Sequence, residues 1–207
     1  MAVVRPNPQM QKLTKDSGVL LEGFYEKMLD CEDYEALVDA FLEQMDTESY
    51  LGITRGGNSV TFEQESRVVE YDGRRVRSVG DFTVDSSTPQ IETTLLIHDD
   101  TNLTRIFPMS DVTVDAETGR FSLRPRLGTP RPADYMKDLS LVREMADGTF
   151  RIETIFNALN TASPTFTGAD KSESECACTF VGNASSWDDT GHAPIEITEF
   201  PPEPPTP

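Results

Sequence analysis

The sequence predicts a mainly β fold of the α+β class: an antiparallel β-sandwich or barrel with one flanking helix and one short helix. Apolar and polar residues alternate with period two over five stretches, the pattern of strands with one buried face. Turn signals such as Asp-Gly separate neighbouring stretches, and only two segments show helical spacing. Closely spaced strands with few helices favour antiparallel pairing.

The longer helix is expected at residues 32–46, where acidic residues near the start favour the N-terminal end. Its apolar side chains form one stripe at helical spacing: Tyr34, Leu37, Val38, Phe41, Leu42 and Met45. The shorter helix is expected at 101–107, with Asp99 or Asp100 as its cap and Pro108 at its end. Its inward side chains are expected to be Leu103, Ile106 and Phe107.

The alternating stretches predict strands at 74–84, 91–97, 139–145, 150–156 and 176–180. Three turn segments are expected to form hairpins: Tyr71–Arg74, Asp115–Gly119 and Asp147–Gly148. The first of these turns would join a strand at 60–70 to the strand at 74–84. Because neighbouring strands joined in this way run antiparallel, the turns set the expected pairing.

The length of 207 residues fits one domain with arms. Residues 1–15, with two prolines and little periodicity, are expected to be an N-terminal arm. Residues 16–200 form the expected domain, and the proline-rich residues 201–207 an extended C-terminal tail. The start of the chain shows no signal-peptide pattern, so export through such a peptide is not expected.

The chain is strongly acidic, with a formal net charge of −18. This charge disfavours nucleic-acid binding by a basic surface, and no apolar run approaches the roughly 20 residues of a membrane span. The charge is uneven: residues 16–50 carry −10, whereas 54–80 carry +1 and 120–151 carry +3. Either these are solvated surfaces, or copies of the chain meet acidic patch to basic patch.

The residues that carry chemistry do not form a recognisable catalytic motif. His98, followed by two aspartates, is the single His–acid cluster, and an enzyme would require it to meet a carboxylate pair. Cys176 and Cys178 have one residue between them, unlike redox or zinc motifs, and are interpreted as buried apolar side chains. The phosphate-binding and nucleophile-elbow motifs are missing too. We therefore expect a protein that is not an enzyme and needs no cofactor or metal.

A series of short motifs is more specific than the composition. In chain order they are DSGVLLEGF at 16–24, YLGITRGG at 50–57, VEYDG at 69–73, ETTLL at 92–96, FNALN at 156–160 and PIEI at 194–197. This order resembles the major tail (tail tube) proteins of long-tailed bacteriophages that infect Gram-positive hosts, over about residues 16–200. The sequence departs from the family pattern after the VEYDG motif, where Arg74, Arg75 and Arg77 are unusually basic.

The resemblance implies a two-sheet β-sandwich whose copies form rings, usually hexameric, with their inner sheets joined into a continuous barrel. Stacked rings would make a hollow tube in the virion, assembled in the cytoplasm of the host bacterium. The implied partners are other copies of the chain, the tape-measure protein, and the tail terminator and distal tail proteins. DNA would pass through transiently and without specificity, and no membrane insertion is implied.

The acidic composition suits such a conduit. Each phosphate neutralised by a basic wall releases counterions and adds affinity, so a basic wall would retain DNA. An acidic wall removes that affinity. Because salt screens charge over about 8 Å, its repulsion acts only near the wall.

Two other interpretations remain open at this stage. One is another virion component with the same sandwich, a tail terminator or baseplate hub protein, which forms single rings. The other is an acidic β-sandwich module that binds carbohydrate or a host surface. That module would need clustered exposed aromatic residues, whereas the chain has 8% aromatic residues and a single tryptophan, Trp187.

The hairpin with Asp72, Arg74, Arg75 and Arg77 is the candidate contact between subunits or between rings. The alternative interpretation is a solvated turn. If the hairpin makes a contact, replacing the three arginines together with neutral residues weakens tube formation. The check is the yield of tubes in electron micrographs, and an unchanged yield contradicts this role.

Overall fold

The structure, a computed structural model, describes residues 17–47, 49–70, 76, 79–96, 99–166, 173–185 and 191–202. The strands in these ranges are β1 (Val19–Glu22), β2 (Ser59–Val68), β3 (Phe82–Leu95), β4 (Ser110–Val114), β5 (Phe121–Pro125), β6 (Met136–Glu144), β7 (Phe150–Asn160), β8 (Cys176–Val181) and β9 (Ile195–Phe200). The helices are α2 (Phe24–Leu29), α3 (Tyr34–Met45), α4 (Asp100–Ile106) and the 3-10 helix η1 (Pro132–Asp134). The predicted mainly β, α+β class is confirmed.

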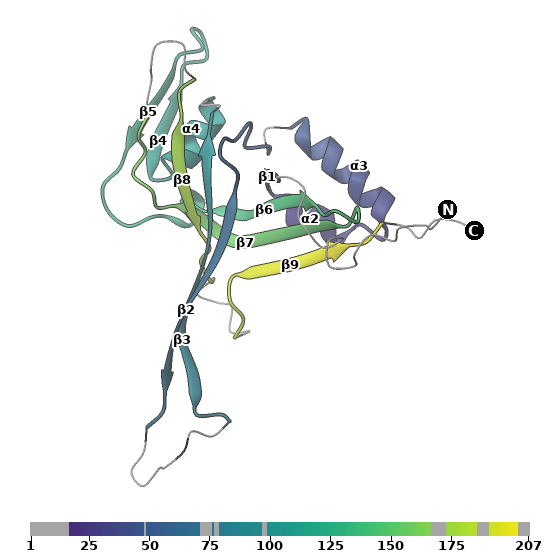
Figure 1. Cartoon of the computed structure of the whole chain (residues 1–207). Helices are drawn as coiled ribbons and strands as arrows, with labels where there is room; N and C mark the ends of the chain where they lie inside the picture. Colours follow the sequence, from purple (N-terminus) through teal and green to yellow (C-terminus); the bar gives the residue numbers. More distant parts are fainter. Residues whose placement is uncertain are drawn as a thin grey trace, which may run out of the picture.

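The strands pair antiparallel in one seven-stranded sheet and one two-stranded sheet (Figure 1). The larger sheet has the order β1-β6-β7-β8-β3-β2, and β9 pairs with β7. Strands β4 and β5 form the smaller sheet. The described strands follow an open path, so this chain by itself does not close the barrel that was one form of the prediction.

Two apolar cores lie on opposite faces of the β1-β6-β7 part of the sheet. The first core joins that part to β3, β8 and α4 through Leu20, Leu139, Leu141, Ile155, Ile91, Leu95, Phe180 and Ile106. The second packs helices α2 and α3 on the other face through Leu21, Val142, Ile152, Phe24, Met28 and Leu37. Strands β6 and β7 are therefore buried on both faces, whereas the period-two pattern predicted one buried face.

Both predicted helices are confirmed, and Asp99, one of the two residues expected to cap the shorter helix, is its cap. Asp33 accepts a hydrogen bond from the Ala36 amide at 2.8 Å, and Asp99 accepts one from the Asn102 amide at 2.7 Å. The predicted apolar stripe of the longer helix is partly wrong, because Leu42 is 54% exposed. Gln44 is buried instead, and its amide donates to the Glu22 carbonyl of β1 at 3.0 Å.

The hairpins predicted at Asp115–Gly119 and Asp147–Gly148 are confirmed by the β4–β5 and β6–β7 pairings. The strands predicted at 74–84 and 91–97 are wrong in their bounds, because a single strand, β3, runs from Phe82 to Leu95 and pairs with β2. The predicted turn at Tyr71–Arg74 and the arm at 1–15 lie outside the described residues. The structure describes only the first two residues of the predicted tail, 201–202.

A matched pair of leucines measures how much the first core stabilises the fold. Leu141 is fully buried in that core, whereas Leu42 lies on the exposed side of α3. We expect Leu141→Ala to lower the free energy of unfolding by about 2–5 kcal/mol, and Leu42→Ala to change it by no more than about 0.5 kcal/mol. Urea unfolding at low protein concentration measures both values. Equal effects would contradict the assignment of this core.

Candidate functional site

The most distinctive surface of the molecule is a two-stranded extension that we call the β2–β3 ribbon, residues 62–68 and 82–89. Strand β8 pairs with β3 only from Gln90 to Leu95, so among the described strands β2 alone pairs with β3 over residues 82–89. The ribbon leaves the packed body and projects to one end of the molecule (Figure 1). It therefore has two faces that the two cores do not cover.

One face of the ribbon is apolar and the other is polar. The face that we call apolar carries Phe62 and Val68 of β2 and Phe82 and Val84 of β3, with Gln64, Ser66 and Ser87 between them and the buried Pro89 at its base. The polar face carries Glu63, Glu65 and Arg67, opposite Thr88, Ser86 and Thr83. Phe82 is 64% exposed and Val84 is 47% exposed. An exposed apolar face of this kind marks a site of interaction in a folded protein.

A β-bulge keeps the apolar residues on one face. Glu65 pairs with Ser86, but the next residue, Ser66, pairs with Val84, so Asp85 is the extra residue. Without this shift, Phe82 and Val84 would lie on the polar face, and Asp85 would lie among the apolar side chains. Instead, Asp85 accepts a hydrogen bond from Arg67 at 2.9 Å.

Asn58 fixes the base of the ribbon to the body. Its side-chain amide donates to the Ser17 carbonyl at 2.9 Å, and its side-chain oxygen accepts from the Thr93 hydroxyl at 2.6 Å. Its backbone carbonyl accepts from the guanidinium of Arg143 on β6 at 2.7 Å, and Arg143 also pairs with Glu153 of β7 at 3.3 Å. These bonds set the direction in which the ribbon leaves the sheet.

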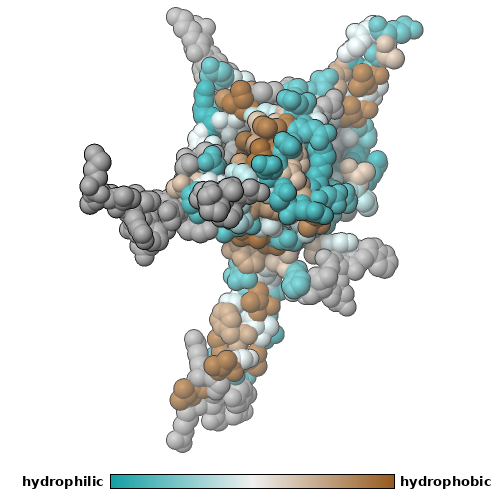
Figure 2. Space-filling view, turned by 90° about the vertical axis from the view of Figure 1, so that its right-hand side faces the viewer, coloured by the Kyte–Doolittle hydropathy of each residue, from teal (hydrophilic) through white to brown (hydrophobic). Residues whose placement is uncertain are grey.

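The predicted contact residues Asp72, Arg74, Arg75 and Arg77 lie outside the described residues, between the two strands of the ribbon. On either side of them, Val69 donates its amide to the Asp81 carbonyl at 2.8 Å. Val76, which lies among them in the sequence, and Val79 are exposed. Figure 2 shows hydrophobic surface continuing along this projection. The alternation at Phe82 and Val84 predicts that these side chains are buried, and this prediction is wrong. Alternation shows that two residues share a face, but it does not show whether another part of the chain packs on that face.

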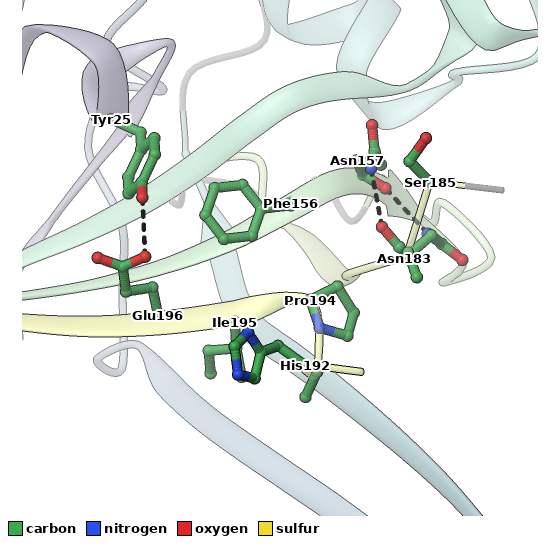
Figure 3. Close-up of a pocket in the computed structure, with 11 residues that line it drawn as sticks. Tyr25, Phe156, Asn157, Asn183, Ser185, His192, Pro194, Ile195 and Glu196 are labelled. Carbon is green, nitrogen blue, oxygen red and sulfur yellow. Dashed lines mark hydrogen bonds between the residues drawn. The ribbon is translucent and has the colours of Figure 1, made fainter. Parts of the chain in front are cut away.

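A cavity of about 610 Å³ lies on the body, between α2, β7 and the start of β9 (Figure 3). At one side the Tyr25 hydroxyl donates to Glu196 at 2.7 Å, and the Tyr25 ring meets Phe156 edge-on with centroids 4.8 Å apart. The hydrogen bond to Glu196 and partial burial raise the pKa of Tyr25 to about 12. These contacts join α2 to β9 across β7.

At the other side of the cavity, Asn157 and Asn183 exchange side-chain hydrogen bonds (Figure 3). Each amide donates to the other residue's backbone carbonyl at 2.9 Å. Asn157 has a φ of 46°, a left-handed conformation that asparagine tolerates better than most residues. The polar groups of this side therefore hold two chain segments together.

The carboxylate of Asp138 caps helix α2 from the neighbouring strand β6. It accepts a hydrogen bond from the Tyr25 amide at 3.2 Å, because the N-cap residue of α2, Gly23, has no side chain to do so. Burial raises the pKa of Asp138, and the amides of Tyr25 and Phe24 oppose that shift. The role of this buried acid is to hold the helix.

The residues considered for catalysis or metal binding divide into two groups. Cys176 and Cys178 lie on one face of β8 in the first core, as predicted, and burial raises the pKa of Cys178 to about 12. His98 lies outside the described residues, as does Trp187, the tryptophan weighed for a carbohydrate-binding module. Among the described residues, no group of three or more His, Cys, Asp or Glu side chains is placed to hold a metal ion.

Comparison with protein-family models and with curated proteins finds no match for this chain. In the part of the chain that the structure describes, none of the helices has the length and apolar character needed to cross a membrane.

The bond between Tyr25 and Glu196 predicts a loss of stability at high pH. The folded-state pKa of about 12 lies above the ordinary value of 10, so the stabilisation is complete below pH 10 and is lost as the pH rises through 12. We expect Tyr25→Phe to have a flatter stability curve between these pH values, measured by urea unfolding. Tyr50→Phe is the matched control, and equal curves for Tyr25→Phe and the wild type would contradict the assignment.

Proposed function

We propose that this chain is the structural subunit of a bacteriophage tail tube. Its copies would assemble as stacked, hexameric rings in the host cytoplasm and form the conduit for tape-measure protein and DNA in the virion. The observation that carries this proposal is the β2–β3 ribbon, a projection with Phe62, Phe82 and Val84 exposed on one face. The order of sequence motifs from residue 16 to about 200 supplies the class of assembly.

The ribbon supports assembly in two ways. Burial of Phe82 and Val84 against another copy removes apolar surface from water, which is the main favourable term in protein association. In addition, the described residues of β2 pair with β3 on one side only, so its outer edge offers backbone groups to a further strand. A chain with a net charge of −18 repels its own copies, so contacts of this kind must overcome that repulsion.

The same charge supports passage of DNA through the assembly. An acidic wall gains no affinity from counterion release, so phosphates move past it without being retained. Tape-measure, terminator and distal tail proteins are the further partners of the proposed tube. No catalytic step and no cofactor form part of this proposal.

Electron microscopy of negatively stained protein over a concentration series tests the proposal. Hollow tubes with regular striations support it, whereas isolated rings favour a terminator or hub protein. A protein that stays monomeric at every concentration counts against the tube and favours the binding module, which a glycan screen then tests.

Two double variants test whether assembly depends on the apolar face of the β2–β3 ribbon. We expect Phe82→Ser with Val84→Ser to raise the protein concentration needed for assembly at least about tenfold, because both apolar contacts are lost. The control, Thr83→Ala with Thr88→Ala, changes the polar face and should assemble like the wild type. Sedimentation measures assembly, and circular dichroism checks the fold. Equal assembly of the two double variants would contradict the role of the apolar face.

A further inference from the structure

A second amphipathic ribbon is formed by β4 and β5. The pairs Val112–Leu123 and Val114–Phe121 lie on one face, and the pairs Asp111–Arg124 and Thr113–Ser122 lie on the other. Val114 is 61% exposed, and Val112 is exposed as well. This β4–β5 ribbon, residues 110–114 and 121–125, thus repeats the design of the β2–β3 ribbon on a shorter scale.

The two ribbons lie at opposite ends of the molecule. In Figure 1, the β2–β3 ribbon points to the bottom of the view and the β4–β5 ribbon to the top. Figure 2, which is turned about the vertical axis, shows hydrophobic surface at both ends. Two apolar faces so far apart cannot cover each other within one copy.

The charges beside the two ribbons are opposite. Residues 61–90, the whole hairpin that contains the β2–β3 ribbon, carry six acids and four arginines, a net charge of −2. Residues 110–131, which contain the β4–β5 ribbon and the segment after it, carry three acids and four arginines, a net charge of +1. Two copies of either ribbon would therefore bring like charges together at one end, whereas one copy of each brings opposite charges together.

We propose that the apolar face of the β2–β3 ribbon in one copy packs on the apolar face of the β4–β5 ribbon in the next copy. Because the two patches differ and lie at opposite ends, each contact leaves one free ribbon of each kind. Such a head-to-tail contact continues along an axis rather than closing into a pair. This inference rests on the proposed self-assembly and assigns the surfaces that join successive copies.

Cysteine cross-linking between two different variants tests the contact. In a Cys31→Ser background, Val84→Cys and Val114→Cys are made in separate chains, one of them carrying a tag that changes its mass. The two proteins are mixed over a concentration series, oxidised, and separated without reductant. We expect a mixed disulfide dimer at least tenfold more abundant than with the control pair Thr83→Cys and Thr113→Cys, which lie on the polar faces.

Each outcome bears on the contact separately from the tube. A dominant Val84→Cys homodimer, or no mixed dimer above the control at any concentration, overturns the proposal. Tubes in micrographs without the mixed dimer leave the proposed function standing and overturn this contact. A mixed dimer without tubes supports the contact and counts against the tube.

Discussion

Strand β7 serves two sheet regions, and the backbone change that separates them lies at Asn157, whose φ is 46°. Strand β7 pairs with β9 up to Ile155 and with β6 up to Ala158, and its last residues, Leu159 and Asn160, pair with β8. The reciprocal bonds with Asn183 hold the change in place. Strand β8 pairs with β3, and β3 pairs with β2, so the direction of the whole β2–β3 ribbon depends on the end of β7 near Asn157. The ribbon base adds a second constraint, since Arg143 binds the Asn58 carbonyl.

The molecule therefore consists of a packed body and two extensions with different sources of stability. The body has an apolar core on each face of β6 and β7, and buried polar groups such as Asp138 are satisfied by backbone amides. The ribbons have backbone pairing, but each leaves one apolar face exposed. An isolated two-stranded ribbon is marginally stable in water, so a partner that covers its apolar face also stabilises its conformation.

The sequence predicted the fold class, two helices and the hairpins β4–β5 and β6–β7, because caps, turns and period-two alternation are local signals. It could not predict which faces are covered. Phe82 and Val84 alternate like core residues but are exposed, whereas Glu153 and Thr154 are buried because helices and strands from distant segments pack on both sides. Gln44 replaces Leu42 inside for a similar reason, since the Glu22 carbonyl of β1 requires a donor there. The contact role of Arg74, Arg75 and Arg77 stays a prediction. The exposed apolar face of the neighbouring β2–β3 ribbon was not predicted from the sequence.

The bulge at Asp85 places the large apolar side chains of the β2–β3 ribbon on the same face. A bulge interrupts the regular ladder, and in the β2–β3 ribbon it moves Phe82 and Val84 onto the face of Phe62 and Pro89. A regular ladder would place Phe82 and Val84 on the opposite face from Phe62. An exposed apolar face would cause non-specific aggregation if it could pack on any other apolar surface. The net charges of the two hairpins have opposite signs, −2 over residues 61–90 and +1 over residues 110–131, so they favour the pairing of unlike ends over the pairing of like ends.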